Sequence, residues 1–446
     1  MTPRIYNLFQ RLVGPTTRWA EHARRARDMG FDWIYLNPWH YPGFSGSLYA
    51  VKEYRRLNPL FVPAGADPLS LEPLREALAE ISALGVRPIM DLVINHTAKD
   101  SPLIQEHPEW YVRDARGEVQ SPFVRDPDDP SKVTTWGDLA EIDNETRQGR
   151  DELWAYWTEL VRDSIELGFQ GFRCDAAYKV PSELWRHLIA EARRVNREVR
   201  FFAETLGAPT EEVAALADAG FDFFFNSSKW WDFSEPWALK QHEEFRVIAP
   251  SVAFPESHDT TRLAADTEGD EAVQRQRYAF AAAFSAGIMM PVGYEFGFQR
   301  QVNVVETVPT HWERRRMDLR RFITRVHALK AGHPLLQGEG VLRDVGGVAG
   351  DTLVLERRAA DTAAAERGWI LINKGWEEGR EVDLAGLAPD SQSDQYRLFR
   401  VCRDDAPEAG EEIGATVALD RAEVAYVLPV GGIPLYPSPV LNEERY

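Results

Sequence analysis

The sequence predicts an α/β fold: a closed (β/α)8 barrel of the TIM type, with a small subdomain inserted after its third strand and a C-terminal antiparallel β domain. Two observations lead to the barrel. Apolar, strand-like runs alternate with amphipathic helical stretches, and eight such runs can be counted. The expected strands are Arg4–Leu8, Trp33–Asn37, Arg87–Ile94, Gly171–Asp175, Arg200–Glu204, Phe221–Asn226, Ser251–Phe254 and Gly287–Val292.

Helical stretches separate most of these runs. Their apolar residues recur at the spacing of a helix that buries one face. The clearest examples are Thr17–Met29, Leu71–Leu84, Glu152–Leu167 and Ser182–Arg193. An open doubly wound sheet would show the same alternation, but no glycine-rich phosphate loop follows the first strand. The sequence therefore favours the closed barrel.

Two segments interrupt the alternation. From Asn95 to about Asn144 the chain is rich in Pro, Asp, Gly and Arg, and so long a loop is usually functional or a small subdomain. From about Gly338 onward, short strands and turns predict an antiparallel β domain. Its expected strands are Thr352–Arg357, Trp369–Asn373, Tyr396–Val401 and Val424–Leu428. We therefore expect a barrel over residues 1–95 and 145–336, an inserted subdomain over 96–144 and a C-terminal β-sandwich domain over 337–446.

Composition restricts the partners of this 446-residue chain. Its formal net charge of -19 argues against nucleic acid, because binding there requires Lys and Arg to neutralise phosphates. No apolar stretch is long enough to cross a bilayer, and the first residues lack the pattern of a secretory signal. We therefore expect a cytoplasmic protein that binds neither nucleic acid nor membrane. Its oligomeric state stays open.

The strongest chemical signal is a set of carboxylates at strand ends. Asp175, Glu204 and Asp259 each follow an apolar run, and a barrel brings the carboxyl ends of its strands to one pocket. Arg173 lies two residues before Asp175, so both side chains point into that pocket and an ion pair would keep Asp175 ionised as a nucleophile. Glu204, buried beside other acids, would hold a proton. This trio predicts glycosyl transfer through an oxocarbenium-like transition state.

Each of these residues also has a structural interpretation. Arg173 and Asp175 could form a buried ion pair that only specifies the fold, and Glu204 could cap the following helix. Cys174 lies between the pair, so strand alternation turns it away from the pocket. We expect Cys174 to pack in the core and not to act as a nucleophile.

Four short motifs, in the same order along the chain, resemble the α-amylase superfamily of glycoside hydrolases (family 13). They are Asp91-Leu92-Val93-Ile94-Asn95-His96, Gly171-Phe172-Arg173-Cys174-Asp175-Ala176-Ala177, Ala203-Glu204 and Ser257-His258-Asp259. Each motif is short, and the ordered set is much more specific than any one of them. The resemblance implies that Asp175 is the nucleophile, that Glu204 is the acid/base and that Asp259 is a third carboxylate supporting the transition state.

The resemblance also implies a set of substrate-binding residues: Tyr49, Asp91, His96, Arg173, Lys179 and His258. Tyr49 would stack on the bound sugar, while His96 and His258 would donate hydrogen bonds to it. Asp91 is expected to brace the arginine and the strand ends. Lys179 either contacts the reducing-side sugar or is a solvated lysine at the start of a helix, and both interpretations stay open.

Two further segments are similar to the α-1,4-glucan:maltose-1-phosphate maltosyltransferases. They are Tyr178-Lys179-Val180-Pro181 and Glu106-His107-Pro108-Glu109-Trp110-Tyr111. Those relatives are much longer, so their handling of phosphate does not transfer as a whole. No cofactor and no metal is predicted. Asn95 matches an asparagine that helps to hold calcium in many relatives, but the inserted segment has no dense acidic cluster.

The sequence thus predicts a retaining enzyme that cleaves α-1,4-glucosidic bonds in malto-oligosaccharides or glycogen-type chains. Water or a sugar hydroxyl can accept the same covalent intermediate, so a transglycosylase, maltosyltransferase or isomerase of the family is the alternative. A non-catalytic glucan-binding barrel is a third interpretation. The three retained carboxylates disfavour it, because a silent relative would be free to lose one.

Overall fold

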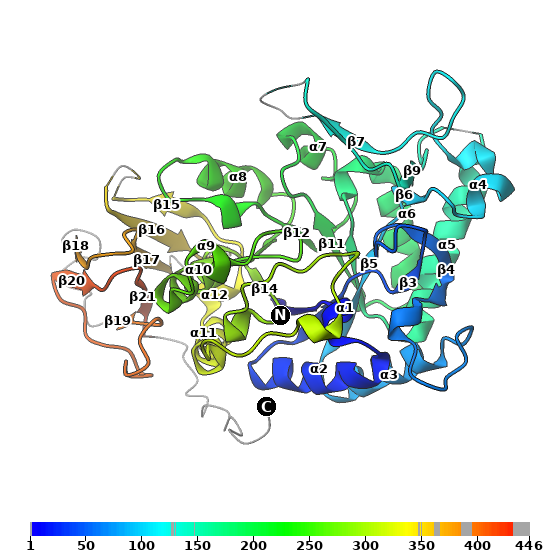
Figure 1. The fold of residues 1–446 in the computed structure, drawn as a ribbon. Helices are drawn as coiled ribbons and strands as arrows, with labels where there is room; N and C mark the ends of the chain where they lie inside the picture. Colours follow the sequence, from blue (N-terminus) through cyan, green and yellow to red (C-terminus); the bar gives the residue numbers. More distant parts are fainter. Residues whose placement is uncertain are drawn as a thin grey trace.

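The computed structural model describes residues 2–125, 129, 131–146, 148–346, 348, 350–360, 366–384 and 395–430. Its centre is a closed barrel of eight parallel strands (Figure 1), so the predicted (β/α)8 fold is confirmed. In barrel order the strands are β1 (Arg4–Leu8), β14 (Gly287–Pro291), β13 (Ser251–Ala253), β12 (Phe223–Phe225), β11 (Arg200–Glu204), β10 (Gly171–Cys174), β5 (Arg87–Leu92) and β2 (Trp33–Leu36). Each lies within one of the predicted runs.

Helices follow most strands and cover the outside of the barrel (Figure 1). The longer ones are α2 (Trp19–Asp28), α3 (Glu72–Ala83), α5 (Arg150–Leu167), α6 (Ser182–Val195), α8 (Trp237–Phe245), α10 (Glu271–Phe284) and α11 (Arg320–Gly332). The shorter ones outside the inserted segment are α1 (Gln10–Val13), α7 (Thr210–Ala214), α9 (Leu263–Asp266) and α12 (Pro334–Gln337). In α3, Leu74, Leu78 and Ile81 are buried together because this spacing places them on one helix face.

Alternate residues of the strands fill the barrel interior. The inner cluster consists of Ile5, Trp33, Tyr35, Ile89, Phe202, Phe225, Val252, Phe254 and Met289. A Cβ atom on Gly171 would lie 3.0 Å from the ring of Trp33, so glycine leaves room for that large side chain. Cys174 belongs instead to the cluster between barrel and helices and is fully buried there. Its predicted packing role is confirmed.

The segment after β5 forms short elements beyond the carboxyl end of that strand. Strands β6 (His96–Ala98) and β9 (Leu139–Glu141) pair, as do β7 (Phe123–Arg125) and β8 (Val133–Thr135). The sequence predicted a loop without helices, whereas the structure has the short helix α4 (Leu103–Glu106) and a 3-10 turn (Pro108–Trp110) in this segment. A second hairpin, β3 (His40–Pro42) with β4 (Val51–Leu57), follows β2.

The C-terminal part is antiparallel, as predicted. One sheet has the order β15 (Leu342–Asp344), β16 (Thr352–Arg358), β17 (Arg367–Asn373), β21 (Val424–Pro429) and β19 (Tyr396–Phe399), and β18 (Arg380–Asp383) pairs with β20 (Thr416–Leu419). It is fastened to α10, where the Tyr426 hydroxyl donates to the Ala279 carbonyl at 2.6 Å. The expected boundaries of the three parts stay predictions. Among the described residues, every helix is too short or too polar to pass through a bilayer.

Candidate active site

The guanidinium of Arg173 joins the acids of three neighbouring strands. Nη1 donates to Asp91 Oδ1 at 3.0 Å and to Asp175 Oδ1 at 2.6 Å, and Nη2 lies 3.9 Å from Glu204 Oε2. Strand register explains the first contact, because Arg173 of β10 lies directly beside Asp91 of β5. Asp91 is fully buried, whereas the Asp175 and Glu204 side chains are 14% and 12% exposed. The arrangement therefore leaves two of the three acids open to a ligand.

Glu204 ends β11, and its carboxyl group accepts two backbone hydrogen bonds. Leu206 N–H donates to Oε1 at 2.8 Å and Ala176 N–H donates to Oε2 at 2.9 Å. Ala176 has a left-handed backbone, with φ of 39°, which is costly for a residue other than glycine. Burial raises the pKa of Glu204 to about 7; Arg173 opposes this rise and the charge of Asp175 adds to it. The group can therefore hold or release a proton near neutral pH.

Asp259 reaches the same region from the loop after β13. Its Oδ2 lies 3.0 Å from His258 Nε2, and its side chain is 54% exposed. Burial works to raise the pKa of Asp259, but the neighbouring His258 and Arg173 outweigh it and lower that pKa. The His258 ring also lies 2.7 Å from the Tyr49 hydroxyl, through the same Nε2 atom. Three predicted residues from two distant segments, Asp259, His258 and Tyr49, thus form one continuous set of contacts.

Asp91 is braced on its second oxygen by two tyrosines. Tyr35 and Tyr49 both donate their hydroxyls to Asp91 Oδ2, at 2.5 and 2.6 Å. Asn37 Nδ2 in turn donates to the Tyr49 hydroxyl at 3.0 Å. Tyr49 donates its hydroxyl proton to Asp91, so its oxygen accepts a hydrogen bond from His258. The donating hydrogen of His258 therefore lies on Nε2, the atom that contacts both Tyr49 and Asp259. Burial raises the pKa of Asp91, and Arg173 opposes that rise.

Sequence reasoning missed Tyr35 and Asn37. Both lie at the end of the predicted second strand, and their spacing of two residues puts them on the same face as each other. Two polar side chains with this spacing, in a strand next to one that carries an acid, could have been recognised as site residues from the sequence. Their contacts with Tyr49 depend on the path of the β3–β4 hairpin, which no motif specifies.

Two predicted substrate-binding residues are held by protein partners. His96 is 6% exposed, and its Nε2 lies 3.2 Å from the Tyr49 carbonyl; burial lowers the pKa of this imidazole. Lys179 is exposed at the start of the segment leading to α6, and its Nζ lies 3.1 Å from Glu212 Oε2 of α7. His96 therefore supports the loop that carries Tyr49. Lys179 is an ion-paired surface lysine near the mouth of the barrel.

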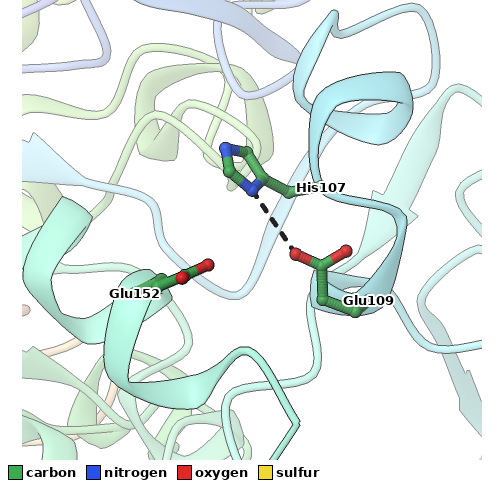
Figure 2. Close-up of side chains that lie close together, drawn as sticks. All are labelled: His107, Glu109 and Glu152. Carbon is green, nitrogen blue, oxygen red and sulfur yellow. Dashed lines mark ion pairs between the residues drawn. The ribbon is translucent and has the colours of Figure 1, made fainter.

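Two places in the described chain offer metal-binding atoms. Oδ1 of Asn95 is buried and has no hydrogen-bond partner among the described residues. No acidic ligands were predicted to accompany it, and Asp126 and Asp128 of the inserted segment lie outside the described residues. The other place is a group of His107, Glu109 and Glu152 (Figure 2), which shares no residue with the cluster around Arg173.

Sequence comparison links the chain to enzymes of α-glucan metabolism. Residues 4–123 match the family described as "Glycogen debranching enzyme, glucanotransferase domain". An α-1,4-glucan:maltose-1-phosphate maltosyltransferase of Burkholderia pseudomallei is 28% identical over 375 residues, which are 80% of this chain and 31% of that protein. The namesake from Myxococcus xanthus is 24% identical over 417 residues, which are 84% of this chain and 60% of that protein. The chain thus spans less than two thirds of the length of each of these relatives.

Structural comparison points to the same fold. The α-amylase of Lactobacillus plantarum superimposes with a TM-score of 0.73 at 22% identity, over 95% of this chain and 98% of that one. The α-amylase of Geobacillus thermoleovorans gives the same TM-score and coverage at 18% identity. The closed barrel and the antiparallel C-terminal part of this chain are thus similar in fold to these α-amylases. Its sequence is similar to the maltosyltransferases named above.

Proposed function

We propose that the chain is a retaining enzyme acting on α-glucans, which cleaves α-1,4-glucosidic bonds in malto-oligosaccharides or glycogen-type chains by double displacement. The observation that carries this proposal is the cluster around Arg173, where one cation meets three carboxylates, two of them solvent-accessible. A surplus of negative charge around solvent-accessible carboxylates stabilises an oxocarbenium-like transition state. The proposal covers the described chain, which corresponds to part of its longer relatives.

Asp175 is the proposed nucleophile. Arg173 holds Oδ1 at 2.6 Å, while Oδ2 has no hydrogen-bond partner within the part of the chain that the structure describes. The held oxygen fixes the orientation of the carboxylate, and the other oxygen is available to attack the anomeric carbon. The new bond from Oδ2 to that carbon forms as the glycosidic bond breaks, which yields a covalent glycosyl-enzyme.

Glu204 is the proposed acid/base. With its pKa raised to about 7, a large fraction of the group is protonated in neutral solution and can give its proton to the departing glycosidic oxygen. In the second step the resulting carboxylate removes a proton from the acceptor as that acceptor attacks the anomeric carbon. Asp259, half exposed beside His258, would bind sugar hydroxyls and add negative charge. Tyr49 and His258 would line the bound ring.

A second candidate differs only in the acceptor. Hydrolysis uses water, whereas transglycosylation uses a sugar hydroxyl, and both share the same intermediate. The names of the relatives favour transfer, since they are maltosyltransferases and the matching family is described as a glucanotransferase domain. Transfer of maltosyl units, from maltose 1-phosphate or from another glucan, is therefore the second candidate.

One experiment tests both candidates. The protein is incubated with maltoheptaose, with and without maltose 1-phosphate, and product lengths and anomeric configuration are followed by chromatography and proton NMR. Shortened products with the α configuration indicate hydrolysis, and lengthened chains indicate transfer. Release of β products would contradict double displacement. The matched control is Asp175→Asn, which should form neither kind of product.

A further inference from the structure

Three side chains that commonly bind metals lie together where the segment after β5 meets helix α5 (Figure 2). His107 and Glu109 come from the short turns that follow α4, and Glu152 comes from the first turn of α5. One ligand atom from each lies within 4.8 Å of the others. We propose that these residues form a site for a divalent transition metal of the Zn²⁺ class, separate from the cluster around Arg173.

The distances suit four-coordinate Zn²⁺. With metal–ligand bonds of about 2.0 to 2.2 Å, two ligand atoms of a tetrahedral site lie about 3.3 to 3.6 Å apart. His107 Nδ1 and Glu109 Oε1 are 3.4 Å apart. Glu152 is exposed, so its side chain can rotate to close the remaining distance. Water would supply the fourth ligand. An imidazole nitrogen favours Zn²⁺ over Ca²⁺ or Mg²⁺, which prefer oxygen ligands.

Packing holds the first two ligands in position. The His107 ring is stacked on the ring of Trp110, with centroids 3.8 Å apart and planes 4° apart, and Trp110 is 3% exposed. Gly149, just before α5, has a φ of +71°, and a Cβ atom there would lie 2.6 Å from Glu109 Cγ. Glycine is therefore required for the helix start to approach Glu109 this closely. The fixed imidazole and this close approach distinguish the group from loose surface acids.

The charges of the group also call for a cation. Within the described residues, Glu109 has His107 as its ion-pair partner, and Glu152 has no ion pair to Lys or Arg. The nearest basic residue in sequence, Arg150, lies over the Trp154 ring at 5.2 Å. Among the described residues, two carboxylates thus face one imidazole with no arginine or lysine in ion-pair contact, although Arg113 donates to the Pro108 carbonyl between His107 and Glu109. A divalent ion would neutralise them and would tie the inserted segment to a barrel helix.

The test uses the full chain after dialysis against EDTA, titrated with ZnCl₂ by calorimetry and followed by thermal unfolding. We expect about one equivalent of Zn²⁺ to bind with a rise of a few degrees in Tm. Substituting Co²⁺ should give the visible absorption bands of a tetrahedral nitrogen–oxygen site. His107→Ala and Glu152→Gln should weaken binding at least about tenfold.

Glu183→Gln is the matched control, because Glu183 is an exposed acid in the first turn of helix α6 and should leave Zn²⁺ binding unchanged. Circular dichroism checks that Glu152→Gln, whose side chain is exposed, is folded. The proposal is overturned if the wild-type chain takes up no Zn²⁺, or if Glu152→Gln and His107→Ala bind it as tightly as wild type. These readouts are independent of glucan cleavage, so the proposed function is tested separately.

Discussion

Two buried arginines in the same barrel hold carboxylates in opposite ways. Arg262 meets one acid: its Nη1 donates to Glu256 Oε1 at 2.7 Å, and Leu263 N–H donates to Oε2 at 2.6 Å. Both side chains are at most 2% exposed. Arg173 faces Asp91 and Asp175 directly and has Glu204 nearby, and only one of these three acids is closed to solvent. The first arrangement is balanced and closed, whereas the second has excess negative charge and is open.

The comparison shows that an ion pair between arginine and a carboxylate can either stabilise the fold or form part of a ligand site. Around Glu256 both carboxylate oxygens have partners and the side chain is only 1% exposed, so a ligand cannot reach it and the pair can only contribute to the fold. Around Arg173 the cation is shared, which leaves Asp175 with an unused oxygen and Glu204 with a pKa of about 7. Excess charge and access to solvent, and not burial alone, distinguish the candidate site from a structural ion pair.

The largest expected effect comes from removing the proposed nucleophile. Asp175→Asn keeps the shape of the side chain and can still contact Arg173, but it cannot form the covalent intermediate. We expect kcat for maltoheptaose cleavage to fall about 10⁴-fold or more, with a normal circular dichroism spectrum. Turnover within tenfold of wild type would remove Asp175 as the nucleophile and would make its ion pair resemble that of Glu256.

The second effect concerns Glu204 and has a defined pH dependence. The acid form is required for bond cleavage, so kcat/KM should be highest below the pKa and decline as pH rises through about 7. Glu204→Gln should lower kcat for maltoheptaose about 10²- to 10⁴-fold and abolish this decline. Aryl glucosides with good leaving groups should lose much less in the first step, since they need little protonation. An unchanged alkaline limb in the variant would assign that pKa to another group.

The strands, and hence the positions of Asp175 and Glu204 at their ends, could be predicted from the sequence. Asp259 was expected at a strand end, but it lies in the loop after β13. Apolar runs have a fixed periodicity, and Arg173 and Asp175 share a face because side chains alternate along a strand. The contact of Arg173 with Asp91 then follows from parallel register, once β5 and β10 are neighbours. These features depend on local pattern and on the geometry of a closed barrel, which is why they could be predicted.

Contacts made by loops could not be predicted in this way. The tyrosine brace on Asp91 requires the β3–β4 hairpin to fold back over the barrel, and Lys179 pairs with Glu212 because α7 happens to lie beside it. The pKa of Glu204 depends on the depth of its burial, which sequence does not specify. His107 and Glu109 lie in one of the motifs described above, but Glu152 belongs to helix α5, more than forty residues further on. The sequence alone could not place these three side chains together.

The closed pair should respond in stability and not in catalysis. Glu256→Gln leaves the Arg262 charge buried without its carboxylate, which we expect to cost about 3 to 5 kcal/mol of unfolding free energy. Thermal unfolding should show a clearly lower Tm, while kcat per folded molecule changes little. If the variant instead lost activity with its Tm intact, the contrast between the two arginines would be wrong.

The smallest expected effect is a test of the tyrosine brace. Tyr35→Phe removes the hydroxyl that donates to Asp91 Oδ2 at 2.5 Å and leaves the Tyr49 hydroxyl on the same oxygen. The loss of one such hydrogen bond is worth about 1 kcal/mol, so kcat/KM should fall about fivefold. The matched control is Tyr426→Phe, which removes an equally buried hydroxyl from the Ala279 carbonyl, far from the carboxylates. Both variants should lose similar stability, and only Tyr35→Phe should lose activity, because only Tyr35 orients the acid that holds Arg173. Equal kcat/KM in the two variants would show that Arg173 and Tyr49 alone keep Asp91 in place.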